Sequence, residues 1–227
     1  MKTTLALITL VALAVTAGAR DNSTADTNTT PAQAEAAYAQ AIEGRTADIL
    51  KVLALSDPAR SAAVHDAIIT QYRALRAWHD ANDASLKVSA KDTNAVAQIR
   101  ASLKTQHDAF IARLAESLTP AQIEQVKDKM TYNKVQVTYG AYCEIIPTLT
   151  EAQKAQILIH LKAAREEAMD GGSADEKSAI FKKYKGRIAN YLAKEGVDET
   201  KARKEWSAQQ KAKSAAATET NGEAPAK

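Results

Sequence analysis

Apolar residues recur through the middle of the chain at intervals of three and four positions. This spacing places them along one face of an α-helix, where neighbouring helices can bury them. Four stripes have the spacing: Val64, Ile68, Tyr72 and Leu75; Val96, Ile99, Leu103, Phe110 and Leu114; Ile157, Leu158, Leu161, Ala164 and Ala168; and Ile180, Tyr184, Ile188 and Tyr191. The pattern predicts an all-α protein.

Capping sequences indicate where the helices begin. Thr30-Pro31-Ala32-Gln33 and Thr119-Pro120-Ala121-Gln122 each combine a Thr cap, a Pro at the first helical position and a Gln three residues after the cap. Thr150-Glu151-Ala152-Gln153 repeats this box without the Pro. Looser start signals occur at Asp57-Pro58, Ser173 and Asp198. Glycines at Gly171-Gly172 and Gly196 indicate helix ends. These signals predict six or seven antiparallel helices, packed as a bundle or as stacked hairpins.

One stretch departs from the helical spacing. Residues 135–139 alternate apolar and polar side chains, which is the two-residue period of a β-strand. A single short strand cannot form a sheet, so we predict an irregular connector over residues 131–147. The connector carries three of the seven tyrosines in the chain, namely Tyr132, Tyr139 and Tyr142.

The first residues have the features of a signal peptide. A positive charge at Lys2 precedes an apolar run at residues 5–15, and small residues follow at Ala17 and Ala19. This predicts cleavage near Ala19 and export to the periplasm or beyond the cell. No later segment is apolar over the length of a transmembrane helix, so we expect no integral membrane segment in the mature chain.

The stretches that flank the helical part lack large apolar side chains, and such stretches do not form a packed core. The predicted organisation is a signal peptide at 1–19, a disordered tether at 20–30, a single all-helical domain at 31–209 and a disordered tail at 210–227.

Composition narrows the class of protein. Of the 227 residues, 30 are Lys or Arg and 27 are Asp or Glu, and a net charge of +3 argues against a nucleic-acid partner. The single cysteine, Cys143, cannot form an internal disulfide, and we expect it to be a buried apolar residue. The oligomeric state is left open.

The connector and one helix face are candidate binding surfaces. Tyrosines on an irregular loop offer flat apolar faces with hydroxyl tips, as in sugar or peptide recognition, or they seal the core. On the last apolar stripe, Arg187 lies between two tyrosines and could present its guanidinium to a carboxylate such as that of a uronic acid, or tie the bundle to a buried acid. The candidate binding residues are Tyr132, Tyr139, Tyr142, Tyr184, Arg187 and Tyr191.

Titratable residues give little indication of catalysis. His79 and Asp83 are four residues apart, but two ligands do not make a metal site. We also expect the second long helix to end at these residues, and the negative end of its dipole would stabilise His79 equally well. We expect no metal and no cofactor. The remaining histidines are isolated in the sequence and are expected at the surface or partly packed: His65, His107 and His160. Three acids that end a helix before Gly171 are expected to be solvated: Glu166, Glu167 and Asp170.

Two families resemble parts of the chain. The Leu-Thr-x-x-Gln boxes at residues 118–122 and 149–153 resemble the signature of the Spy-like periplasmic stress proteins, which are helical chaperones or sensors. A longer set of segments, from about Ala36 to Trp206, includes Gln71-Tyr72-Arg73-Ala74-Leu75, Met130-Thr131-Tyr132, Ala163-Ala164-Arg165-Glu166-Glu167 and Asn190-Tyr191-Leu192. These segments are similar to Domain of Unknown Function 3826, a family of exported bacterial proteins often found where complex polysaccharides are digested. The resemblance implies export, an all-helical fold and a link to glycans, and it supplies no catalytic residues.

These observations favour an exported, non-catalytic binding or accessory protein that holds a glycan fragment, a peptide or a partner helix. One alternative is an enzyme acting on polysaccharide through paired carboxylates, with Glu144, Glu167 or Asp83 as candidates. Two carboxylates converging in one deep pocket with Tyr132 or Arg187 would favour that alternative. Another is a Spy-like holdase or stress sensor, which would expose a concave apolar patch.

Overall fold

The computed structural model describes residues 30–222, and over this range the chain forms eight helices. They are α1 (Pro31–Leu53), α2 (Pro58–Val88), α3 (Thr93–Ala115), α4 (Pro120–Met130), α5 (Lys134–Ile145), α6 (Glu151–Met169), α7 (Ala174–Lys194) and α8 (Glu199–Gly222). The all-α prediction is confirmed, with one helix more than the expected upper number. The predicted signal peptide, and the predicted tether up to residue 29, lie outside the described residues.

The capping boxes act as their sequences predict. Thr30, Thr119 and Thr150 each accept a hydrogen bond from the backbone N–H of a Gln three residues later, and each Gln side chain accepts one from the Thr backbone. Helix α7 ends before Gly196, which has the left-handed φ of 77° that terminates many helices. Local sequence therefore sets most of the helix boundaries.

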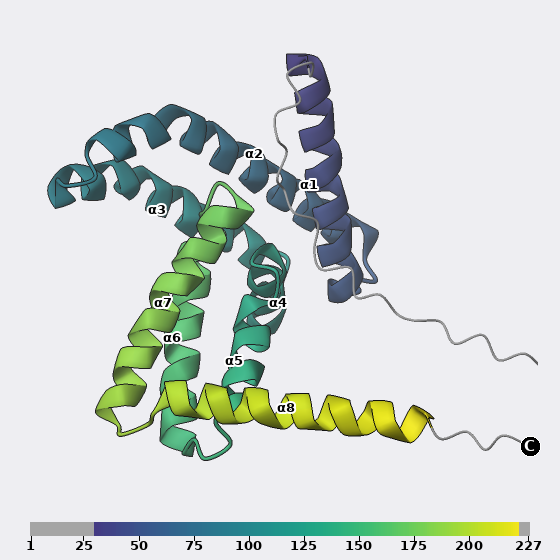
Figure 1. Ribbon diagram of the computed structural model, residues 1–227. Helices are drawn as coiled ribbons and strands as arrows, with labels where there is room; N and C mark the ends of the chain where they lie inside the picture. The colour runs from purple at the N-terminus through teal and green to yellow at the C-terminus, as the bar shows by residue number, and fades with distance from the viewer. Residues whose placement is uncertain (1–29, 223–227) are drawn as a thin grey trace, which may run out of the picture.

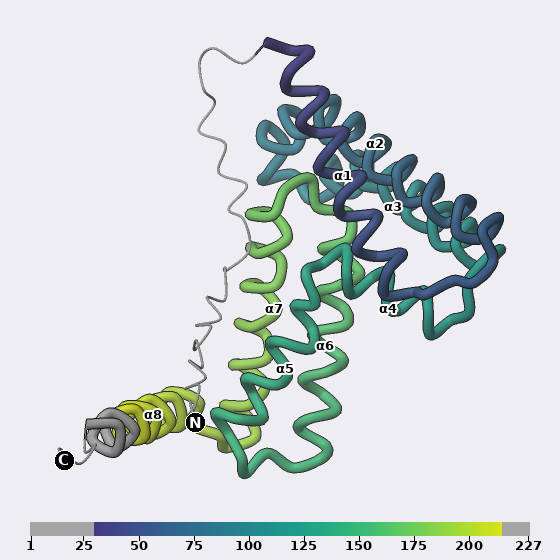
Figure 2. Tube along the Cα trace, turned by 90° about the vertical axis from the view of Figure 1, so that its right-hand side faces the viewer, coloured from purple at the N-terminus to yellow at the C-terminus, as the bar shows by residue number. Residues whose placement is uncertain are grey.

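The helices form two groups that meet at the α6–α7 turn. Figure 1 shows α2 and α3 as one long hairpin, and α6 and α7 as a second hairpin whose turn reaches the first. Figure 2 shows α5 beside α6 of that second hairpin, and both helices contribute to the same hydrophobic core. Helices α1 to α4 share one hydrophobic core and α5 to α8 share another, while Met169 of α6 is buried in the first core. The α6–α7 turn is therefore fixed between both halves of the molecule.

The prediction of an irregular connector at residues 131–147 is wrong for most of its length, because α5 occupies residues 134 to 145. The break from α4 is confined to a short turn, in which Tyr132 and Asn133 take left-handed φ values of 59° and 53°. Beyond it, Val135, Tyr142 and Ile145 are buried along one face of α5, whereas Val137 is 68% exposed. Burial follows the helical period, and the alternation in the sequence has no counterpart in the packing.

Two other boundaries differ from the sequence expectations. Helix α2 continues to Val88, so His79 and Asp83 lie within it, and the prediction that they close it is wrong. The negative end of α2 therefore cannot explain His79. Helix α8 continues to Gly222, past residue 210, where a disordered tail was expected to begin. In the part of the chain that the structure describes, no helix is both long enough and apolar enough to span a membrane.

Candidate functional site

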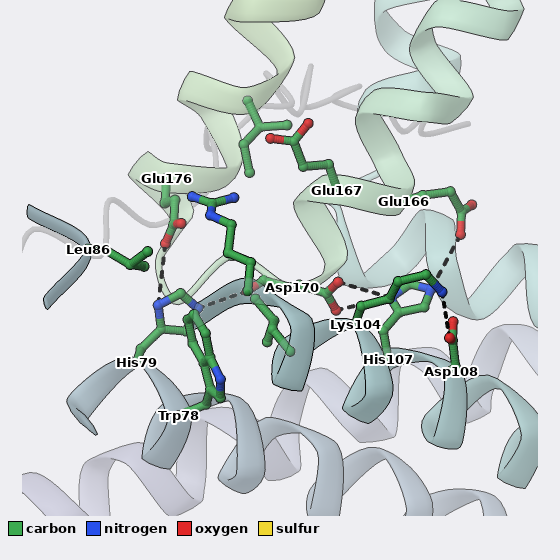
Figure 3. Close-up of a pocket in the computed structure, with 14 residues that line it drawn as sticks. Trp78, His79, Leu86, Lys104, His107, Asp108, Glu166, Glu167, Asp170 and Glu176 are labelled. Carbon is green, nitrogen blue, oxygen red and sulfur yellow. Dashed lines mark hydrogen bonds and ion pairs between the residues drawn. The ribbon is translucent and has the colours of Figure 1, made fainter. Parts of the chain in front are cut away.

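Two cavities of opposite charge lie on either side of the α6–α7 turn, and Gly171 lines both. The first, here called the acidic cavity, has a volume of about 390 Å³ and lies between α2, α3, α6 and α7 (Figure 3). Its ionisable lining residues are His79, Arg100, Lys104, His107, Asp108, Glu166, Glu167, Asp170 and Glu176. The second, here called the basic cavity, has a volume of about 240 Å³. It is lined by Tyr38, Arg45, Tyr72, Leu75, Arg76, Met130, Tyr132, Lys177 and the residues from Gly171 to Ala174.

The two glycines of the turn are closely packed, and the packing is tighter at Gly172 than at Gly171. A Cβ atom on Gly172 would lie 2.7 Å from Cγ of His79, on the side of the acidic cavity. A Cβ atom on Gly171 would lie 3.0 Å from Cγ of Lys177, on the side of the basic cavity. The backbone of the turn therefore packs against an imidazole at Gly172 and against a lysine side chain at Gly171.

Asp170, the residue before this turn, is held by histidines from two different helices. His107 of α3 places its Nδ1 3.0 Å from Oδ1 of Asp170, and its Nε2 lies 3.7 Å from Oε2 of Glu166 (Figure 3). The hydrogen bond to Asp170 raises the pKa of His107 above its ordinary value, against the opposing effect of burial. His107 is partly packed, which was one of the two expectations, and it pairs with carboxylates at the end of α6.

His79 of α2 contacts the same residue through its backbone. Nε2 of His79 lies 2.8 Å from the carbonyl oxygen of Asp170, and Nδ1 lies 2.9 Å from Oδ1 of Asp83. Because both neighbours are acceptors, both ring nitrogens donate only when the ring is protonated. Burial opposes that charge, but the hydrogen bonds to Asp170 and Asp83 outweigh it and raise the pKa of His79. His79 therefore ties α2 to the turn, and both of its contacts are complete only when the ring is protonated.

Lys177 dominates the basic cavity. The residue is 5% exposed, and its Nζ donates to the carbonyl oxygens of Met130 at 3.1 Å and Met169 at 3.4 Å. These carbonyls lie at the negative ends of α4 and α6, which favours a cation there. No ion pair joins Lys177 to a carboxylate of the described residues. Burial, together with the nearby Arg45, lowers the pKa of Lys177 to about 8, although the charges of Asp170 and Glu176 oppose this shift.

The rest of the basic cavity is aromatic and cationic. Tyr38 donates its hydroxyl to the carbonyl oxygen of Tyr72 at 2.7 Å, and the guanidinium of Arg76 lies 4.3 Å above the Tyr38 ring. Arg76 is also paired at 2.8 Å with Glu35, which is not part of the lining. Tyr132 is 43% exposed and lies at the cavity. The described lining thus holds three cations, three tyrosines and the first residues of α7, and it contains no carboxylate.

A family model described as a protein of unknown function (DUF3826) matches residues 39–212. The match covers well over half of the chain. The chain belongs to the DUF3826 family. No curated protein matches the sequence. The match includes every residue that lines the acidic cavity, and all residues that line the basic cavity except Tyr38.

The structure of this DUF3826 protein distributes the six predicted binding residues over several places. Tyr132 lines the basic cavity, and Tyr139 lines a separate groove between α4, α5 and α6. Tyr142 is 2% exposed and belongs to the second core, with Arg203 stacked at 5.7 Å. Because these three do not share a surface, the predicted tyrosine platform on the connector does not form.

The predicted helix face lies on α7, and none of its three residues lines either cavity. The guanidinium of Arg187 lies 4.4 Å above the ring of Tyr184, which is buried, and Tyr191 packs against the second core near His160. Arg187 and Tyr184 are therefore brought together. Among the described residues, the contact that Arg187 makes is with the Tyr184 ring, and the fork to a ligand carboxylate stays a prediction.

The acids considered for catalysis do not converge with the tyrosine or arginine that would favour an enzyme. Glu144 accepts a hydrogen bond from Trp206, and Asp83 contacts His79. Glu167 lines the acidic cavity, while Tyr132 lines the basic one, and Arg187 lines neither. In the described part of the chain, no group of three or more His, Cys, Asp or Glu side chains is arranged to hold a metal ion. Cys143 is half-buried.

Sequence reasoning did not find Lys177, Arg45 or the pairing of His107 with Asp170. The pair is separated by 63 positions, so no local motif contains it. Lys177 did carry a signal, because it lies three residues before Ile180 and so falls on the apolar stripe of α7. In the structure, this lysine lies on a buried helix face because its ammonium donates to two carbonyl oxygens at the basic cavity.

Proposed function

We propose that this protein is an exported binding protein that holds a small carboxylated sugar, or an organic acid of similar size, in the basic cavity. The observation that carries the proposal is the buried ammonium of Lys177, which donates to two carbonyl oxygens and forms no ion pair with a carboxylate of the described residues. Its export is proposed from the signal-peptide features of the first residues.

The charge of the cavity argues for an anionic ligand. Two of the three N–H groups of Lys177 are committed to Met130 and Met169, which leaves one donor. Burial and Arg45 disfavour the charge of Lys177, and the carboxylates of Asp170 and Glu176 offset them only in part, because its pKa stays lowered to about 8. A ligand carboxylate would stabilise the ammonium further through a charge-assisted hydrogen bond. Arg45 and the amino end of α7 at Ser173 add positive potential on the same cavity.

Size and shape narrow the ligand further. A volume of about 240 Å³ is below the roughly 300–1,000 Å³ of sites for drug-sized molecules, so the cavity suits a single sugar ring or a smaller acid. Tyr38, Tyr72 and Tyr132 contribute apolar faces and hydroxyl groups, a combination that suits a ring with several hydroxyls. A carboxylated monosaccharide matches both the positive charge of the cavity and its tyrosine-lined surface.

Isothermal titration calorimetry with glucuronate, and with glucose as its uncharged counterpart, tests the proposal. We expect glucuronate to bind and glucose to bind at least about tenfold more weakly, because glucose lacks the carboxylate that compensates Lys177. Arg45→Gln should weaken glucuronate binding, whereas Arg187→Gln, which removes an arginine outside both cavities, should not. Equal affinity for glucose and glucuronate, or equal binding by both variants and the wild type, would contradict the proposal.

A further inference from the structure

We infer that protonation of His79 and His107 in the acidic cavity strengthens ligand binding in the basic cavity, by holding the α6–α7 turn that separates the two. The inference rests on the proposed function and adds its regulation. It predicts a protein that captures its ligand more tightly in acid than at neutral pH.

Both histidines act on one residue. His79 reaches the turn from α2 and His107 from α3, and they contact the carbonyl and the carboxylate of Asp170, respectively. Asp170 caps the end of α6 and directly precedes Gly171. Two cationic contacts from a different hairpin therefore determine where the backbone enters the turn.

The charges around each ring favour its protonated form. His79 faces Asp83 of its own helix and Glu176 of α7, whose carboxylate lies 3.8 Å away. That same carboxylate accepts the backbone N–H of Gly172 at 2.9 Å. When His79 loses its proton, either Asp83 or the Asp170 carbonyl loses its donor, because a neutral ring has only one N–H.

His107 has a similar setting with one opposing cation. Asp170 and Glu166 of α6 face its two nitrogens, and Lys127 of α4, which is paired with Glu166, opposes them. Lys104 and Asp108 of α3 line the same cavity and pair with each other at 2.5 Å. Deprotonation of His107 turns an ion pair with Asp170 into a hydrogen bond from a neutral imidazole to a carboxylate, which weakens the hold on the turn.

The turn transmits this change because the same backbone lines the basic cavity. Gly172 packs against His79, Gly171 packs against Lys177, and the residues from Gly171 to Ala174 are part of the basic lining. A loosened turn must be ordered again when the ligand binds, and that ordering opposes binding. Protonation of His79 and His107 orders the turn before the ligand arrives, so ligand binding no longer has to order it.

Lys177 also titrates, and its effect must be separated from that of the histidines. Its pKa of about 8 means that an anion loses its partner above that pH. The pKa values of His79 and His107 are raised above the ordinary value near 6.5, so both rings are charged at about pH 5.5 and lose their protons as pH rises. Glucuronate affinity is therefore measured by calorimetry at about pH 5.5 and about pH 7.5, an interval in which Lys177 stays mostly charged.

The variant for this measurement is the double substitution His79→Gln with His107→Asn, which keeps polar side chains in place. The control is His65→Asn, because the pKa of His65 is also raised, by Asp66 and Glu43, but His65 lines neither cavity. We expect wild type and His65→Asn to bind glucuronate about threefold or more tightly at the lower pH, and the double variant to lose this difference. The same pH dependence in the double variant would overturn the inference.

Hydrogen exchange of the ligand-free protein gives a second readout. Gly171 and Gly172 donate their amides to Ala168 and Glu176, so their protection reports on the turn directly. After correction for intrinsic exchange, protection should be greater at about pH 5.5 than at about pH 7.5 in the wild type but not in the double variant. Equal protection at both pH values would overturn the inference. Glucuronate binding without pH dependence would leave the proposed function standing, whereas no binding at any pH would overturn both.

Discussion

The imidazole of His79 occupies the space that a side chain at position 172 would need: a Cβ atom on Gly172 would lie only 2.7 Å from Cγ of His79. The ring in turn is fixed by Asp83 and by the carbonyl oxygen of Asp170. Helix α2 and the α6–α7 turn are therefore fitted to each other at this point, although 91 positions separate His79 from Asp170.

The first prediction concerns this fit. Gly172→Ala should destabilise the protein by about 1–3 kcal/mol, because the added methyl group must displace a ring that is held from two sides. Urea unfolding followed by circular dichroism measures the change. The control is Gly186→Ala on α7, where a Cβ atom meets nothing within 4 Å, and where replacing glycine within a helix should stabilise by about 0.5–1 kcal/mol. Equal effects of the two substitutions would contradict the proposed fit.

The second prediction concerns the pH dependence of stability below pH 8. The folded-state pKa values of His79 and His107 are raised, so the folded protein binds protons more readily than the unfolded chain. Their contribution to stability is fully present below about pH 6.5 and is lost as pH rises through the folded-state values. Urea midpoints of the wild type should therefore fall over this interval, and the double variant His79→Gln with His107→Asn should flatten the fall. An unchanged slope in the double variant would show that other groups produce it.

The third prediction concerns the interval above pH 8, where the sign reverses. The pKa of Lys177 is about 8 in the folded protein, below its ordinary value of 10.5, so the unfolded chain binds more protons between these values. Stability should rise with pH over this interval by about 1.4 kcal/mol for each pKa unit of the shift. The rise ends near pH 10, where Tyr72, whose pKa is raised by burial, begins to oppose it. In Lys177→Met, urea unfolding should show no such rise, and a rise of equal size would contradict the assignment to Lys177.

The fourth prediction concerns Tyr132, which combines a left-handed φ of 59° with a place at the basic cavity. Tyr132→Gly should stabilise the fold by about 1 kcal/mol because glycine adopts this conformation without strain. The same variant should weaken glucuronate binding, since it removes an aromatic face from the cavity. Calorimetry and urea unfolding measure the two effects. Asn133→Gly is the matched control, because asparagine already tolerates its φ of 53° and Asn133 does not line the cavity.

Helical periodicity alone could not resolve α5. Over residues 135–139 a short apolar–polar alternation fits a strand and a helix face equally poorly, and only the burial of Val135, Tyr142 and Ile145 shows which face meets the core. Helix starts were predicted more accurately than α5, because a helix cap involves residues within four positions of one another. Thr119, for example, finds both of its capping partners in the same segment.

The sequence by itself determined the helical class, most helix starts, and the glycines at the α6–α7 turn and after α7. Each of these depends on interactions between residues that are close in the chain, and such interactions leave a pattern with a fixed spacing. The two cavities are different, because Lys177 meets Met130 across 47 positions and His107 meets Asp170 across 63. Only the crossing of the two hairpins brings these groups together. Charge and burial at a site depend on that crossing, so the function proposed here follows from the tertiary structure.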